Sequence, residues 1–150
     1  MPKIDIEDIQ ASNATAYPAE YADVVTGRWY KRLGQLSGLS DFAVSHVELD
    51  AGAWSAQRHW HEEEDEFVVV LSGRAVLVED NGETLLRAGD CAAFPKGRPD
   101  GHCLINRFDE PCTFIVVGQS VNGPCHYPDI DMRDFGAGDK RRKDGSSFQG

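Results

Sequence analysis

Short apolar or alternating runs recur along the middle of the chain, and each is followed by a turn signal. Between residues 28 and 117 the runs are RWYKRL, FAVSHVEL, FVVVL, AVLVED, ETLLR, CAAF, HCLINRF and CTFIVV. Glycine, proline, asparagine and aspartate separate them, as in DAGA, LSGR, DNG and FPKGRPDG. Asn81-Gly82, between two such runs, is a strong hairpin signal. Strands this short and regularly spaced predict an all-β protein, an antiparallel sandwich or barrel.

The pattern is confined to the middle of the chain, so we predict three parts. They are an N-terminal arm at 1–28, a single β-barrel domain at 29–119, and a loop-rich C-terminal extension with a basic tail at 120–150. The arm has no sustained period and could be extended or form a lid. The tail carries the basic run from Lys140 to Lys143. We interpret it as a frayed, solvated terminus, because charged chain ends are usually disordered.

Composition narrows the class of partner. A chain of 150 residues, 41% of them hydrophobic, can bury the core of one domain. Its formal net charge of −10 argues against nucleic acid or anionic membranes as partners and favours small molecules or metals. No segment approaches a membrane span. The first ten residues, MPKIDIEDIQ, lack an apolar signal core, so we expect a cytoplasmic protein.

The four cysteines show no metal-binding spacing. Cys91, Cys103, Cys112 and Cys125 form no CxxC pair, which argues against a zinc knuckle. In a cytoplasmic chain we expect reduced core thiols rather than disulfides.

The segment RHWHEEEDEFVVVLSG, residues 58–73, places two histidines and five acidic residues before a buried-type strand. His59 and His61 are two positions apart, so on a strand both imidazoles point to one face. Glu66 is an odd number of residues beyond His61, so it shares that face only if the chain turns between them. EEED is a plausible turn. Glu66 would then begin the next strand and share a face with Val68 and Val70.

This phase separates Glu66 from the other acidic residues. Residues 62–65 are most simply a wet hairpin tip, whereas a carboxylate facing a core is costly unless it is paired or coordinated. His102 opens a later strand, after a loop rich in proline and glycine. Three imidazoles and one carboxylate suit iron(II), manganese, nickel, copper or zinc better than calcium or magnesium. The predicted metal ligands are His59, His61, Glu66 and His102.

Other polar residues give weaker signals. Lys96 and Arg98, on the loop before the last predicted ligand, could hold a phosphate or carboxylate of a substrate, although a solvated loop explains them as well. Arg58 alternates outward from the first ligand and ranks below them. His46 and His126 fit surface or satisfied core positions. No general base stands out, so the catalytic residues stay unknown.

Two groups of residues, within about residues 40 to 118, resemble the paired motifs of the cupin superfamily. The first group is Gly52, His59, His61, Glu66 and Gly73, and the second is Gly89, Pro95, Gly97, His102 and Asn106. There is one extra residue between Gly52 and His59, and a longer loop between Gly97 and His102, but no ligand is lost. The chain ends, including HYPDIDMR, are similar to small bacterial single-domain cupins often labelled sugar-phosphate-isomerase-like, a group of poorly defined function.

The resemblance implies a double-stranded β-helix, or jelly-roll barrel, with a divalent transition metal (Fe, Mn, Zn or Ni) in its mouth and a homodimeric assembly. Three functions stay open. The first is isomerase-like Lewis-acid chemistry on a small oxygenated metabolite. The second is an iron(II)-dependent dioxygenase, and the third is a non-catalytic cupin that binds a small molecule. Fold alone does not decide among them.

Overall fold

The computed structural model describes residues 2–120 and 122–148, and strands dominate them. The strands are β1 (Arg28–Arg32), β2 (Phe42–Leu49), β3 (Trp60–His61), β4 (Glu66–Ser72), β5 (Arg74–Glu79), β6 (Gly82–Arg87), β7 (Cys91–Phe94), β8 (Cys103–Ile105), β9 (Cys112–Gln119), β10 (Cys125–Tyr127), β11 (Met132–Asp134) and β12 (Lys140–Arg141). The helical turns are η1 (Ile6–Asp8), α1 (Ala19–Ala22), η2 (Asp23–Val25) and α2 (Leu33–Leu36). The all-β prediction is confirmed. None of the helices in the described part of the chain has the length and apolar character of a membrane span.

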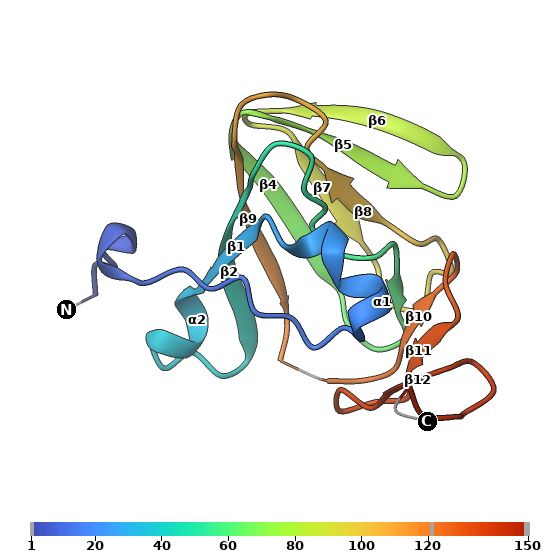
Figure 1. Cartoon of the computed structure of the whole chain (residues 1–150). Coiled ribbons are helices and arrows are strands. Elements are labelled where there is room, and N and C mark those ends of the chain that lie inside the picture. The colour runs from blue at the N-terminus through green and yellow to red at the C-terminus, as the bar shows by residue number, and fades with distance from the viewer. Residues whose placement is uncertain (1, 121, 149–150) are drawn as a thin grey trace.

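The strands pair antiparallel in three sheets. One has the order β1-β2-β9-β4-β7, the second β6-β5-β8, and the third β12-β11-β10-β3. Figure 1 shows β5 and β6, in lime green, at the top of the view and the red-orange β10–β12 at the lower right. The non-consecutive neighbours β2-β9 and β5-β8 join segments far apart in sequence, as expected for a barrel built from two interleaved sheets.

Period-two alternation builds the core. On β4, Val68 and Val70 are 2% and 1% exposed, whereas Phe67 and Leu71 face outward. The core inside the barrel comprises Val47, Leu49, Val68, Val70, Ala75, Leu77, Leu86, Leu104 and Phe114, with Ala53 and Cys112. Each large apolar side chain buried in this way contributes roughly 1.5–3 kcal/mol. Because Glu66 is in phase with Val68, β4 begins with a carboxylate on the face of the core.

The predicted hairpin is confirmed between β5 and β6. Glu79 pairs with Gly82, so the two turn residues are Asp80 and Asn81. The turn therefore begins one residue earlier than the Asn81-Gly82 signal suggests.

Two motif residues hold the chain where strands approach closely. Gly73 has φ 71°, and a Cβ there would collide with the carbonyl oxygen of Pro111. Glycine alone fits both the backbone conformation and the contact. Asn106 is fully buried and donates hydrogen bonds to the carbonyl oxygens of Leu49 (3.0 Å) and Glu110 (2.7 Å).

The C-terminal extension is more ordered than predicted. Between its loops it contributes three short strands to the third sheet, and β10 pairs with β3 so that Cys125 lies opposite His61. The prediction of a frayed basic tail is wrong over β12 and the residue after it. There, Arg142 Nη2 lies 3.3 Å from Glu20 Oε1, which ties the extension to the N-terminal arm.

The N-terminal arm packs against both the barrel and the extension. Ser12 and Tyr30 exchange backbone hydrogen bonds of 3.0 and 2.9 Å, which fastens the arm to β1. The Tyr17 ring meets Tyr127 of β10 edge-on, with centroids 5.9 Å apart. A second buried cluster forms where arm and extension meet, centred on Cys125, Tyr127 and Met132.

All four cysteines are free thiols, as predicted. Cys103, Cys112 and Cys125 are buried, but Cys91 is exposed rather than part of the core.

Candidate metal centre

A cavity of about 660 Å³ extends into the barrel, and the four predicted ligands line it. Barrel strands supply one part of its wall. The arm and the extension supply another part, through Tyr17, Cys125, Tyr127 and Lys140. The cavity volume lies within the range of small-molecule sites.

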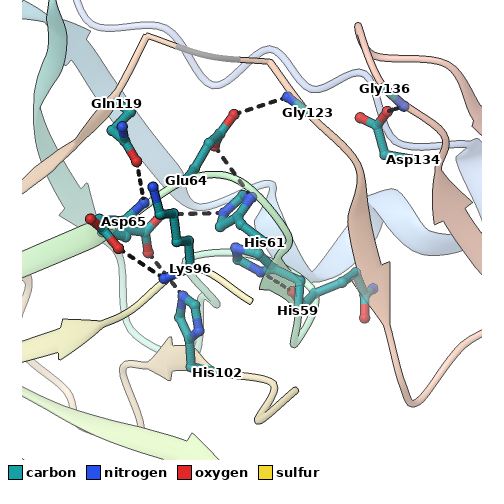
Figure 2. Close-up of polar contacts among 12 residues, drawn as sticks. His59, His61, Glu64, Asp65, Lys96, His102, Gln119, Gly123, Asp134 and Gly136 are labelled. Carbon is teal, nitrogen blue, oxygen red and sulfur yellow. Dashed lines mark hydrogen bonds and ion pairs between the residues drawn. The ribbon is translucent and has the colours of Figure 1, made fainter. Parts of the chain in front are cut away.

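The three predicted histidines meet because two strand ends pair. His59 and His102 exchange backbone hydrogen bonds of 3.1 and 2.8 Å in an isolated bridge. The ring centroid of His59 lies 4.8 Å from that of His61 and 4.7 Å from that of His102. Figure 2 shows the three imidazoles gathered at one place. Trp60 lies between His59 and His61 in the sequence, so its side chain points to the opposite face of the strand, where it stacks on the ring of His126.

Glu66 joins the three imidazoles. Its Oε1 lies 2.9 Å from His102 Nε2, and its Oε2 lies 3.5 Å from His61 Nε2. Burial by itself would raise the pKa of Glu66, but hydrogen bonds to these imidazoles outweigh burial and hold the pKa well below its usual range. Ligand atoms of His59, Glu66 and His102 all lie within 4.8 Å of one another. The structure therefore brings the four predicted ligands together, with the carboxylate ionised.

His59 is held in the form that binds metals. Its Nδ1 lies 2.8 Å from the carbonyl oxygen of Gln57. A carbonyl can only accept, so Nδ1 carries the proton and Nε2 keeps its lone pair. Burial, together with the nearby His102 and His61, lowers the pKa of His59 to about 3, so the ring is neutral at physiological pH.

His61 and His102 each keep a buried ring nitrogen without a hydrogen-bond partner, in both cases Nδ1. His61 Nδ1 lies 3.3 Å from Glu64 Oε2, close enough for an ion pair, but the angles are not those of a hydrogen bond. Burial lowers the pKa of His61, yet the nearby Cys125 and Glu66 outweigh it and raise the pKa to about 10. This environment favours positive charge at the site, whether a proton or a metal cation supplies it.

Comparison with known proteins agrees with this geometry. Residues 45–118 match the family model described as Cupin domain. A solved structure from Silicibacter pomeroyi, described as a sugar phosphate isomerase from a cupin superfamily, is 44% identical, covering 98% of this chain and 96% of that chain with a TM-score of 0.91. The chain belongs to the cupin superfamily.

The fold is shared more widely. The polyketide cyclase RemF from Streptomyces resistomycificus is 20% identical, with a TM-score of 0.72 over 87% of each chain, a likeness of fold alone. Among curated proteins, no sequence matches this cupin. The double-stranded β-helix predicted from the two motifs is confirmed.

The acidic run of this cupin is only partly the wet tip that its sequence suggests. Glu63 and Asp65 are exposed as predicted. Glu62 binds His126, with Oε1 and Nε2 2.7 Å apart. The side chain of Glu64 is 18% exposed and lines the cavity, where Figure 2 shows it between His61 and the backbone of Gly123. The extension contacts the tip, since Gly123 N–H donates to Glu64 Oε1 and Glu62 N–H donates to the carbonyl oxygen of Pro124, long-range contacts that no local pattern reveals.

Cys125 is a further candidate ligand that sequence reasoning missed. Ligand atoms of His59, His61 and Cys125 also lie within 4.8 Å of one another. The thiol reaches the site because β10 pairs with β3. The extension has no sustained period, so its sequence gives no sign of this pairing.

The predicted substrate anchors do not line this large cavity, although Arg98 lines a small separate pocket together with His61 and His102. Neither Lys96 nor Arg98 is among the described residues that line the cavity, and the Lys96 backbone N–H donates to Asp65 Oδ1. Their role stays a prediction. Arg58 points away from the site, as predicted, and binds Asp129 at 2.8 Å. The Arg and Lys residues among the lining are Arg28, Arg32 and Lys140.

Proposed function

We propose that this cupin holds one divalent transition metal through its three imidazoles and the ionised carboxylate and acts on a small oxygenated metabolite. The observation that carries the proposal is the convergence of His59, His61, Glu66 and His102 in a cavity of about 660 Å³. The mixed nitrogen and oxygen donors fit iron, manganese, zinc or nickel. His61 and His102 each keep a buried Nδ1 without a hydrogen-bond partner, so protein groups alone do not satisfy these two rings.

The chain's own residues prepare the site. When bound, the metal supplies Lewis-acid polarisation of a carbonyl or enediolate oxygen. Gln57 fixes the tautomer of His59, and Phe94 stacks on His102 with ring centroids 3.6 Å apart, which limits rotation of that ring. Glu66 adds the negative charge that offsets the charge of a cation. The cavity admits the substrate next to these residues.

Isomerase-like chemistry is the version that we favour. The Silicibacter pomeroyi structure, similar over nearly the whole of both chains, is described as a sugar phosphate isomerase. The same donor set also suits an iron(II)-dependent dioxygenase, and the cavity also suits a non-catalytic cupin that only binds its ligand.

One experiment separates the three functions. Protein loaded with manganese, zinc, nickel or iron(II) is incubated with aldose and ketose phosphates in deuterated water, and NMR follows deuterium entry beside the carbonyl. Isomerase-like chemistry predicts metal-dependent exchange that His102→Ala abolishes. Oxygen uptake with iron(II) and none with zinc would indicate the dioxygenase instead. Neither exchange nor oxygen uptake, with ligand binding retained, would indicate a binding protein.

Homodimerisation, predicted from the family resemblance, and a cytoplasmic location stay predictions. Light scattering coupled to gel filtration checks the first.

A further inference from the structure

The wall of the cavity contributed by β1 carries two guanidinium groups. Arg28, Tyr30 and Arg32 are spaced two residues apart on β1, so their side chains share a face. The Cζ atoms of Arg28 and Arg32 lie 5.4 and 5.2 Å from the ring centroid of Tyr30. All three residues line the cavity.

Arg28 is held by neutral groups. Its Nη1 donates to the carbonyl oxygen of Ser55 at 3.0 Å, and its Nη2 donates to that of Ala14 at 3.4 Å. Its Nε is buried and has no hydrogen-bond partner. Burial is the main reason why the pKa of Arg28 is lowered, and Tyr17 is the neighbour that opposes this most. The guanidinium is therefore positioned and partly desolvated, with a donor to spare.

The carboxylates in the same cavity are engaged elsewhere. Glu66 contacts His61 and His102, and Asp134 lies 3.4 Å from Lys140. Over residues 2–120 and 122–148, no carboxylate forms an ion pair with Arg28; the other cavity carboxylate, Glu64, lies beside His61. A partly buried charge without a counter-charge is costly, and an anionic ligand would offset that cost.

We propose that Arg28, assisted by Arg32, binds an anionic group of the substrate, a phosphate or a carboxylate. This inference deepens the proposed function by naming the substrate class: a small oxygenated anion whose other end lies at the metal. Only the contact between the substrate and the metal rests on the proposed function; anion binding by Arg28 does not. Tyr127 connects the two regions, because its ring lies 5.8 Å from His59 and 5.9 Å from Tyr17.

Both arginines of this proposed anion site lie outside the matched family segment. Tyr17 lies in the arm, Arg28 at the start of β1 and Tyr127 in the extension, all beyond residues 45–118. The cupin segment thus carries the metal ligands, and the flanking segments carry the group that selects substrates by charge. The similarity to the Silicibacter pomeroyi structure covers 98% of this chain and 96% of that chain, so the same division is expected there.

The test measures anion binding apart from the metal. Chelator-treated protein is titrated calorimetrically at constant ionic strength with inorganic phosphate and, separately, with malonate, which distinguishes phosphate from carboxylate as the preferred group. Wild type should bind at least one of them. Arg28→Met should weaken binding by on the order of tenfold or more, because a charge-assisted hydrogen bond is lost. Arg28→Lys should recover part of the affinity, and Arg32→Met should lose less than Arg28→Met.

Matched controls keep the result interpretable. Arg74→Met removes an exposed guanidinium that lies over Phe108 outside the cavity, and it should bind like wild type. If circular dichroism shows that Arg28→Met is unfolded, the affinities of Arg28→Lys and Arg32→Met test the proposal, which predicts that both bind the anion more weakly than wild type. His102→Ala should retain anion binding, so failure of the metal site leaves this inference standing. No binding of either probe to wild type, or equal binding in all arginine variants, overturns it.

Discussion

His59 Nδ1 donates a hydrogen bond of 2.8 Å to the backbone carbonyl oxygen of Gln57. Gln57 also contacts the arm twice: its backbone N–H donates to the Tyr17 hydroxyl at 3.2 Å, and its Nε2 donates to the carbonyl oxygen of Tyr21 at 2.9 Å. The orientation of His59, a candidate metal ligand, is therefore linked to a segment that lies more than 30 residues before it in the sequence.

Removing the Tyr17 hydroxyl should loosen this link. Tyr17→Phe should weaken metal binding measurably, by up to roughly tenfold. Loss of a group that contacts a ligand directly typically costs about 10- to 100-fold, and Tyr17 acts only through Gln57. Tyr21→Phe is the matched control, because its backbone carbonyl rather than its hydroxyl accepts the bond from Gln57. Competition with a chromogenic chelator measures both affinities. Equal affinities in Tyr17→Phe and wild type would show that the arm does not influence the ligand.

Glu66 and Glu63 test whether the acidic run acts as a site or as diffuse charge. Glu66→Gln should lower metal content strongly, because the ionised carboxylate lies 2.9 Å from His102 Nε2. Glu63→Gln should hardly change it, because Glu63 is exposed. Elemental analysis after identical purification gives the comparison. Similar losses in both variants would favour a diffuse charge cluster.

His102 is the predicted ligand farthest in sequence from the others. A metal bound only to the native state stabilises it by mass action, so a chelator should lower the melting temperature of the wild type. The same chelator should have a much smaller effect on His102→Ala. Cys103 is buried on the other side of this strand end, so Cys103→Ser should keep its metal. Loss of metal in Cys103→Ser, with retention in His102→Ala, would show that the strand phase is wrong.

The candidate metal ligands could be predicted because their positions follow local rules. His59 and His61 obey the period of a strand, and Glu66 is in phase with Val68 on β4. Strands β10 to β12 of the third sheet were not predicted, because their segment has no hydrophobic alternation. They form by pairing with one another and with β3. Glu64, Cys125 and Arg28 enter the cavity only through such long-range packing, and sequence spacing carries no information about it.

The cysteines differ in reactivity for a physical reason. Burial raises the pKa of Cys103 to about 12 and of Cys112 to about 11, from an ordinary value of 9.0. Both stay protonated in the folded protein at pH 8, and only the thiolate reacts. The contribution of these two thiols to the free energy of unfolding is fully present below pH 9. It is lost as the pH rises toward 11–12, because the thiols ionise in the unfolded state at a lower pH than in the folded state.

An aromatic disulfide reagent at pH 8 should therefore label Cys91 rapidly in the native protein. Cys103 and Cys112 should react only after denaturation. Cys91→Ser should remove the fast phase. A fast phase that survives in Cys91→Ser would mean that one of the buried thiols is accessible.

Anomalous diffraction from crystals of the metal-loaded protein, recorded at the absorption edge of that metal, tests the central claim most directly. We predict one strong anomalous peak at coordinating distance from His59, His61, Glu66 and His102. A peak bound by His59, His61 and Cys125 but away from Glu66 and His102, or no peak in the cavity at all, would contradict the account.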